Sequence, residues 1–221
     1  MLTSGPRYGQ LLLWVVSLLA LVASGGSARG ETEGWLQRLQ DRLDSLQSFR
    51  ATFVQEYEPR AFSRRQRESG TVHFQKPGKM RWDYDFPETK LALSDGQRVW
   101  IYYPREHRAD VELLARLGDS APAVQILMGR WRLRERFRLQ SLERHESEVT
   151  LNLVPREQEA AVRAVRITVR EPDLALRVLE AEEPGGNLLR YRFEDWQEGI
   201  EISADLFRFT PPPGTRVQEV R

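Results

Sequence analysis

The sequence predicts a mainly β, α+β domain: one curled antiparallel sheet with two or three short helices laid over one mouth. Two observations support this fold class. About ten segments alternate apolar with polar residues or are rich in β-branched and aromatic residues, which is too much strand for a doubly wound fold. Residues 74–103 hold three of these segments, separated by Pro-Gly, Phe-Pro and Asp-Gly pairs, as expected of an antiparallel meander.

The predicted meander has one broad aromatic face. Apolar and charged residues alternate strictly between Met80 and Phe86, so the four large side chains of this segment fall on one face of a strand. Residues 91–103 repeat the alternation around a hairpin turn at Asp95-Gly96. Such a face either closes on other side chains or leaves room for a ligand, and the residues alone favour the filled core.

The first 30 residues are predicted to be a secretory signal peptide that is cleaved. Arg7 is the only charge before the apolar run at residues 11–23, and small residues follow through Ala28. The run is shorter than the ~20 residues that a membrane span needs, so a signal is favoured over an anchor. Cleavage after Ala28 and cleavage after Gly30 fit equally well, and residues 31–221 then form a single domain.

Charge and cysteine content narrow the class of protein. Removal of the signal takes Arg7 and Arg29 from totals of 33 basic and 32 acidic side chains, so the mature chain is close to neutral and nucleic acid is not an expected partner. The chain has no cysteine. An exported protein without disulfides indicates a bacterial periplasm, and the missing cysteine excludes an N-terminal lipid anchor. We expect a soluble periplasmic monomer.

The first third of the mature chain is predicted to form a helix, a strand and a loop. Gly34 to Gln47 is amphipathic, with leucines at helical spacing, and residues 49–58 alternate as a strand. Residues 59–68 are basic; a solvated loop is the favoured interpretation, and contact with anionic lipid headgroups is the alternative. A second helix of about two turns lies between Ser120, its predicted cap, and Gly129, and needs packing to hold.

The second half of the chain is predicted to be mostly strands. Residues 131–137 are ambiguous between helix and strand, and Ile200 and Ile202 suggest one further short strand before a proline-rich loop at residues 210–214. The remaining predicted strands span residues 139–144, 149–154, 162–170, 174–183 and 188–196.

No enzyme signature is present in the sequence. The three histidines are scattered without metal-ligand spacing, and no serine sits in a Gly-x-Ser-x-Gly turn. A glycine-rich phosphate loop is also missing. Asp83 and Asp85 face away from the aromatic side of their strand and are predicted to be exposed rather than catalytic. We therefore expect no enzyme activity, no metal and no cofactor.

Several short motifs follow one another along the mature chain. They are RLDSLQSFRATFVQ at residues 42–55, GTV at 70–72, KPGKMRW at 76–82, SDG at 94–96, VWIY at 99–102, AP at 121–122 and FRFTPPPG at 207–214. Each is weak alone, but the ordered set is specific. It makes the chain resemble the periplasmic lipoprotein carriers of Gram-negative bacteria, the LolA-type chaperones. The missing cysteine separates it from the outer-membrane receptor of the same fold, which is itself a lipoprotein.

The resemblance implies both a fold and a function. The sheet would be an unclosed half-barrel with an α-helical lid over a hydrophobic cavity. The cavity would hold the acyl chains of lipoproteins released by an inner-membrane ABC transporter and deliver them to the outer-membrane receptor. By the resemblance and by the apolar faces of the strands, the acyl-binding residues are expected to be Leu43, Phe53, Val72, Met80, Trp82, Val99, Ile101, Val124 and Ile126.

One position is expected to control the lid. Lys76 stands where the family commonly has an arginine that bonds backbone carbonyls of the lid helix and keeps the empty cavity shut. A lysine has three donors on a flexible stem instead of a planar fork of five, so the closed lid is expected to be looser. Three other functions stay open: a lipid-binding sensor that controls a membrane partner, a carrier of another envelope lipid, and a periplasmic hydrolase with a lipid-shaped cleft.

Overall fold

The structure, a computed structural model, describes residues 25–61, 65–118, 121–157 and 161–220, with side chains from Gly34 onward. The predicted signal peptide therefore lies mostly outside the described residues. The helices are α1 (Gly25–Ser45), α2 (Pro122–Leu127) and α3 (Leu133–Arg136), with 3-10 turns at Pro104–Glu106, Leu114–Leu117 and Ala204–Phe207.

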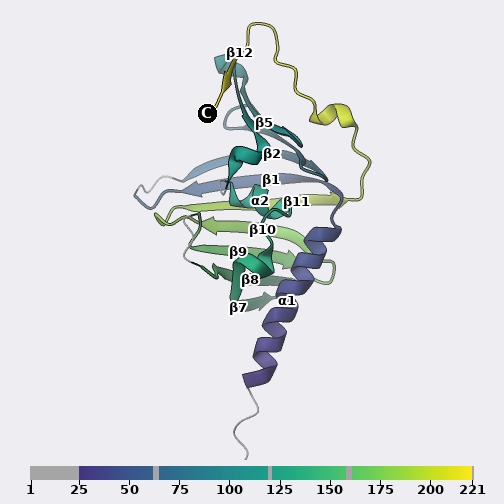
Figure 1. The fold of residues 1–221 in the computed structure, drawn as a ribbon, viewed down its shortest axis with the longest axis vertical. Helices are drawn as coiled ribbons and strands as arrows, with labels where there is room; N and C mark the ends of the chain where they lie inside the picture. Colours follow the sequence, from purple (N-terminus) through teal and green to yellow (C-terminus); the bar gives the residue numbers. More distant parts are fainter. Residues whose placement is uncertain (1–24, 62–64, 119–120, 158–160, 221) are drawn as a thin grey trace, which may run out of the picture.

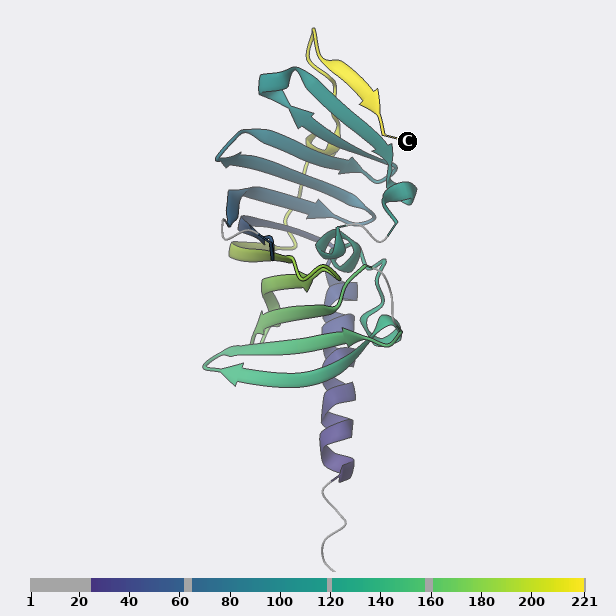
Figure 2. The same cartoon turned by 90° about the vertical axis from the view of Figure 1, so that its left-hand side faces the viewer.

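Among the residues that the structure describes, twelve strands form one sheet, and the sheet does not close. The order across it is β12-β6-β5-β4-β3-β2-β1-β11-β10-β9-β8-β7, so β12 and β7 are edges that do not pair with each other. Figure 2 shows the curl of this sheet, with yellow β12 at one end and β7 and β8 at the other. The strands are β1 (Ser48–Glu58), β2 (Gln66–Gln75), β3 (Lys79–Phe86), β4 (Lys90–Asp95), β5 (Arg98–Tyr103), β6 (Arg108–Leu113), β7 (Phe137–His145), β8 (Glu148–Pro155), β9 (Ala164–Arg170), β10 (Ala175–Glu182), β11 (Leu188–Glu198) and β12 (Arg216–Glu219).

The predicted fold class is confirmed: a mainly β, curled and unclosed sheet with few helices. The predicted turns are also present. Asp95 accepts hydrogen bonds from the backbone N–H groups of Gln97 and Arg98 at 2.7 and 2.8 Å, and Gly96 takes a positive φ of 98° that glycine adopts without strain. The ambiguous residues 131–137 divide between α3 and the start of β7.

Local details differ from the predictions at several points. Ile200 and Ile202 lie in irregular chain, because both sides of the neighbouring strand β1 are already occupied by β2 and β11. The terminal loop is followed by β12, which pairs with β6 in parallel, whereas all other pairs are antiparallel. Phe86 is 55% exposed at the end of β3, although Met80, Trp82 and Tyr84 on the same face are buried. The predicted cap Ser120 lies outside the described residues.

A β-bulge brings β2 unusually close to β3. The register shifts between Ser69 and Gly70, and Gly70 faces Tyr84. A Cβ atom on Gly70 would lie 1.9 Å from the backbone oxygen of Asp83, where no atom fits. Glycine is therefore required here for the two backbones to pair.

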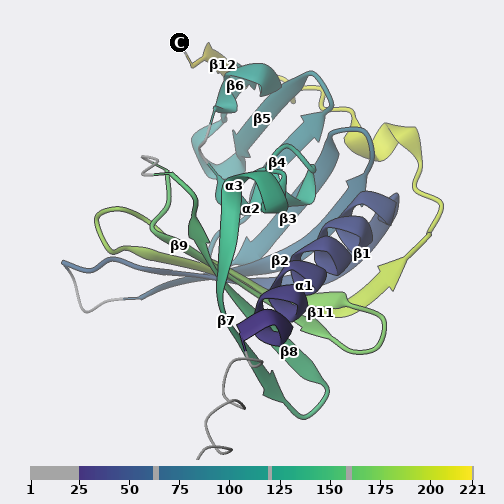
Figure 3. The ribbon, with the colours of Figure 1, turned by 60° about the horizontal axis from the view of Figure 1, so that its bottom comes forward.

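The two faces of the sheet are covered differently. The helices α1, α2 and α3 lie on the inner side of the curl, as Figures 1 and 3 show, and leucines, an isoleucine and a tryptophan from them join the main core. The outer side of β3 to β6 is covered by the C-terminal segment. There Phe207 is 1% exposed, and the ring of Phe209 lies 5.3 Å from both Trp100 and Tyr102. The inner, helix-covered side is the one that carries the predicted site.

Candidate acyl-binding site

The inner face of the sheet carries a continuous floor of aromatic rings. Phe49 stacks on Phe74 with ring centres 5.1 Å apart, and Phe53 packs edge-on against Trp82 at 4.8 Å. Trp82 in turn lies 5.3 Å from Tyr191 of β11. These contacts join strands that are far apart in the sequence, because β1 pairs with β11 as well as with β2. The floor is an apolar surface of the kind that acyl chains can contact.

The structure brings most of the predicted residues together beneath the helices. Val124 is half-buried and packs against the same core. Six others are at most 5% exposed and belong to one cluster: Leu43, Phe53, Val72, Met80, Trp82 and Ile126.

Val99 and Ile101 lie at the margin of this site. Ser94 pairs with both Met80 and Val99, and Ala92 with both Trp82 and Ile101, so all four apolar side chains are on one face. Val99 and Ile101 are nevertheless only half-buried and lie outside the main cluster. The core beneath the helices thus reaches β4 through Ala92, and β5 lies at its margin.

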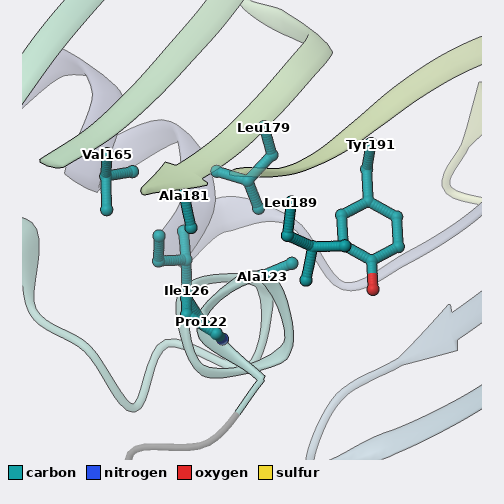
Figure 4. Close-up of a pocket in the computed structure, with 8 residues that line it drawn as sticks. All are labelled: Pro122, Ala123, Ile126, Val165, Leu179, Ala181, Leu189 and Tyr191. Atoms are coloured by element: carbon teal, nitrogen blue, oxygen red, sulfur yellow. The ribbon is translucent and has the colours of Figure 1, made fainter. Parts of the chain in front are cut away.

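A narrow seam separates α2 from the sheet (Figure 4). It contains about 190 Å³ of space between atoms but is nowhere wide enough for a water molecule. The seam is lined by Pro122, Ala123, Ile126, Val165, Leu179, Ala181, Leu189 and Tyr191. Sequence reasoning missed the five residues from β9, β10 and β11. The alternation of apolar and polar residues within each strand shows which of these side chains share a face of the sheet. Only the pairing of β1 with β11, which the sequence does not reveal, places that face opposite α2.

The second helix is held by few local contacts of its own. It has six residues, well below the ~12–15 at which isolated helices become marginally stable. Its N-cap, Ala121, has a positive φ of 52° and supplies no side-chain cap. The buried amide of Gln125 donates to the carbonyl of Gly118 at 2.6 Å. Packing on the sheet therefore holds α2 in place and keeps the seam shut.

Three charged residues, Lys76, Asp44 and Arg132, form a latch that joins the turn after β2 to α1 and to the segment between α2 and α3. The Nζ of Lys76 donates to the carbonyls of Leu43 and Asp44, both at 2.8 Å, in the last turn of α1. These carbonyls have no partner within the helix, and a cation is favourable at this end. The Asp44 carboxylate accepts two hydrogen bonds from Arg132 at 2.8 and 2.9 Å.

The latch reaches the second helix only indirectly. The resemblance leads one to expect Lys76 to bond the lid helix itself, whereas the carbonyls it contacts belong to α1. The connection onward is made by Asp44 to Arg132, and by Gln40, whose side-chain oxygen accepts from the backbone N–H of Leu133 at 2.7 Å. The pKa of Lys76 is lowered, mainly because the side chain is partly buried. The negative charge of Asp44 acts in the opposite direction and offsets part of this shift.

A second group of side chains, the polar cluster, lies on the inner face beside the aromatic floor. It consists of Gln55, Glu68, Tyr84, Lys90 and Tyr191. Tyr84 donates to Gln55 at 2.9 Å, Gln55 to Glu68 at 3.0 Å, and Lys90 to Glu68 at 2.6 Å. The pKa values of Tyr84 and Tyr191 are both raised. Burial is the largest cause, and the negative charge of nearby Glu68 raises both further. The two tyrosines are therefore neutral donors near neutral pH.

The raised pKa of Tyr84 predicts a loss of stability in alkali. Above its ordinary pKa of 10.0 the unfolded chain gives up the phenolic proton while the folded chain keeps it. The folded state then binds more protons, so the free energy of unfolding falls as the pH rises through this range. We expect urea denaturation between about pH 9 and about pH 11 to show that the free energy of unfolding falls less steeply with pH for Tyr84→Phe than for the parent protein. An equally steep fall for both proteins would contradict this.

In the part of the chain that the structure describes, no helix is long and apolar enough to cross a membrane. The same residues contain no group of three or more histidine, aspartate or glutamate side chains placed to hold a metal ion.

Comparison with known proteins agrees with this geometry. Residues 44–210 match the family model described as outer membrane lipoprotein carrier protein LolA. An outer-membrane lipoprotein carrier protein of Methylococcus capsulatus is 31% identical over 91% of this chain and 95% of its own length. One of Dechloromonas aromatica is 28% identical over 91% of each chain.

A solved structure shares the fold at low sequence identity. An uncharacterized conserved protein of Thermus thermophilus superimposes with a TM-score of 0.54 at 14% identity, covering 83% of this chain and 98% of that one. The family match covers most of the sequence, including α2, the latch and the aromatic floor. The chain belongs to the LolA family of outer membrane lipoprotein carrier proteins.

Proposed function

We propose that this protein is a periplasmic chaperone that holds the acyl chains of lipoproteins between α2 and the aromatic floor. The observation that carries the proposal is the apolar seam beneath a short helix with little stability of its own. In the structure the seam is shut, so chains enter as the helices move away from the sheet. The segment at residues 1–30 would direct export, and the protein would act without catalysis, metal or cofactor.

The cost of exposing acyl chains explains why a carrier is needed. At ~0.8 kcal/mol per CH₂, a triacyl anchor with about 40 methylene groups costs on the order of 30 kcal/mol to leave in water. An inner-membrane ABC transporter would load the carrier, and an outer-membrane receptor with higher affinity would unload it. Closure of the helices on the floor restores the apolar contacts that cargo replaces, so it favours release.

Native mass spectrometry of the protein purified from periplasm without detergent tests this proposal. We expect a complex with acylated lipoprotein, formed again when the empty protein meets a synthetic triacylated lipopeptide but not the same peptide without acyl chains. Phospholipid alone would instead indicate a lipid shuttle or sensor. A protein that stays empty under both conditions would show that the inner face is only a packed core.

The latch predicts how fast cargo leaves. Lys76→Leu removes two hydrogen bonds from a charged donor to α1 and so destabilises the empty, closed state. The open, loaded state then becomes relatively more populated, and we expect release of a fluorescent lipopeptide to be about ten-fold slower. Stopped-flow transfer to acceptor vesicles measures it. Lys76→Arg, which keeps a cation at α1 and offers five donors, is the control and should release at the parent rate or faster; equal rates for all three proteins would refute the latch.

A further inference from the structure

The polar cluster lies directly beside the apolar site. Tyr191, Gln55 and Glu68 are neighbours in register across β11, β1 and β2. Two residues along the same strands, on the same face, come Phe193, Phe53 and Gly70. On the inner face, a row that contains aromatic side chains is therefore followed directly by a row of side chains that form hydrogen bonds.

Tyr191 belongs to both regions. Its ring lines the seam under α2 and lies 5.3 Å from Trp82. Figure 4 shows the ring extending from β11 with its hydroxyl on the side away from that strand, at the opposite end of the seam from Val165. To the residues that the structure describes, this hydroxyl makes no hydrogen bond. Tyr191 is half-buried and its hydroxyl is not among the buried side-chain atoms that lack a partner, so the hydroxyl is accessible and can donate to an oxygen that enters the seam.

The other residues of the polar cluster also retain hydrogen-bond donors and acceptors that their contacts within the cluster do not use. Lys90 uses one of its three N–H groups on Glu68 and lies 4.2 Å over the ring of Tyr84. Gln55 gives one amide N–H to Glu68 and has a second, and the two oxygens of Glu68 can each accept another bond. The cluster thus offers donors to carbonyl oxygens and one carboxylate to an amide N–H.

This chemistry matches the junction between acyl chains and a polar head. Resting on the proposed function, we propose that the polar cluster binds the ester and amide linkages of the cargo, with the Tyr191 hydroxyl donating to an acyl carbonyl at the mouth of the seam. The chains then lie under α2, and the linkage sits in the row of Tyr191, Gln55 and Glu68. Such an arrangement fixes how deep the chains insert and distinguishes acylated cargo from a bare hydrocarbon.

Tyr191→Phe tests the assignment, because it removes the hydroxyl and keeps the ring. Binding is measured for three probes: a triacylated cysteine lipopeptide, a diacyl phospholipid, and a pyrene-labelled alkane that has no carbonyl. We expect the lipopeptide to bind about three- to ten-fold more weakly than to the parent protein, and the alkane to bind equally. Tyr102→Phe on the outer face, where the ring packs on Phe209, is the matched control and should change neither.

The outcomes separate this inference from the proposed function. If Tyr191→Phe binds both the phospholipid and the lipopeptide more weakly, the cluster recognises any acyl ester. If only lipopeptide binding is weakened, the cluster recognises the amide-linked head of the lipopeptide. Unchanged lipopeptide binding, or equal losses for lipopeptide and alkane, overturns the role of the hydroxyl while leaving the carrier function standing. A parent protein that binds no lipopeptide overturns both. Circular dichroism and melting temperature confirm that each variant is folded.

Discussion

Gly70→Ala is expected to destabilise the fold by about 4 kcal/mol or more, a large part of the stability of a domain of this size. The new Cβ would lie 1.9 Å from the backbone oxygen of Asp83 and 2.9 Å from the Cα of Tyr84. No side chain can rotate to make room, because both obstacles are backbone. The bulge would have to open, and with it the pairing of β2 with β3 under the aromatic floor.

Urea denaturation of the purified variant measures this loss. Gly34→Ala is the matched control, since a Cβ on Gly34 meets nothing within 4 Å inside α1. Replacing a helical glycine by alanine stabilises by roughly 0.5–1 kcal/mol, so the two variants should shift the midpoint in opposite directions. A Gly70→Ala protein within about 0.5 kcal/mol of the parent would show that β2 and β3 are farther apart than the structure has them.

Met80→Glu is expected to have the second large effect, on both stability and cargo. Met80 is 2% exposed, and the residues paired with it on either side, Phe74 and Ser94, carry no charge to offset a buried carboxylate. We expect a loss of about 3–5 kcal/mol at pH 7. Burial raises the pKa of such a group, so the loss should be smaller near pH 4.5, where the carboxyl is closer to protonated in the folded chain.

Val99→Glu separates the loss of folding from the loss of binding. Val99 is on the same face as Met80 but only half-buried, so its glutamate reaches water and should cost under about 1 kcal/mol. If acyl chains extend over β5, the folded variant binds the triacylated lipopeptide several-fold more weakly. Parent-like binding would restrict the site to the part of the floor that the helices cover. Met80→Leu, which keeps volume and polarity, should be close to the parent in both assays.

The sequence predicted what depends on local pattern. Strict alternation placed Met80 and Trp82 on one face, and the Asp-Gly turn fixed the register between β4 and β5. Long-range pairing was not predictable in the same way. Leu179 and Leu189 meet α2 only because β11 pairs with β1, and nothing local specifies this partner.

The misses have a common physical cause, which is competition for partners. The alternation at Ile200 suits a strand, but no edge near β1 is free, and Ser48 instead donates its hydroxyl to the Ile200 carbonyl at 2.8 Å. Arg216 begins a strand because the edge of β6 is free, and its N–H donates to the carbonyl of His107 at 2.7 Å. The partner of Lys76 was also decided by tertiary structure, since α1 ends beside it.

The open edge between β7 and β12 has a mechanical consequence. In a closed barrel the strand number and stagger fix the radius, so the interior cannot widen without breaking hydrogen bonds. This sheet has two ends, and small changes of twist distributed over its strands can alter its curvature while every ladder stays intact. A sheet of this kind is compliant, so the space beneath its helices can widen or narrow without the loss of any strand pairing.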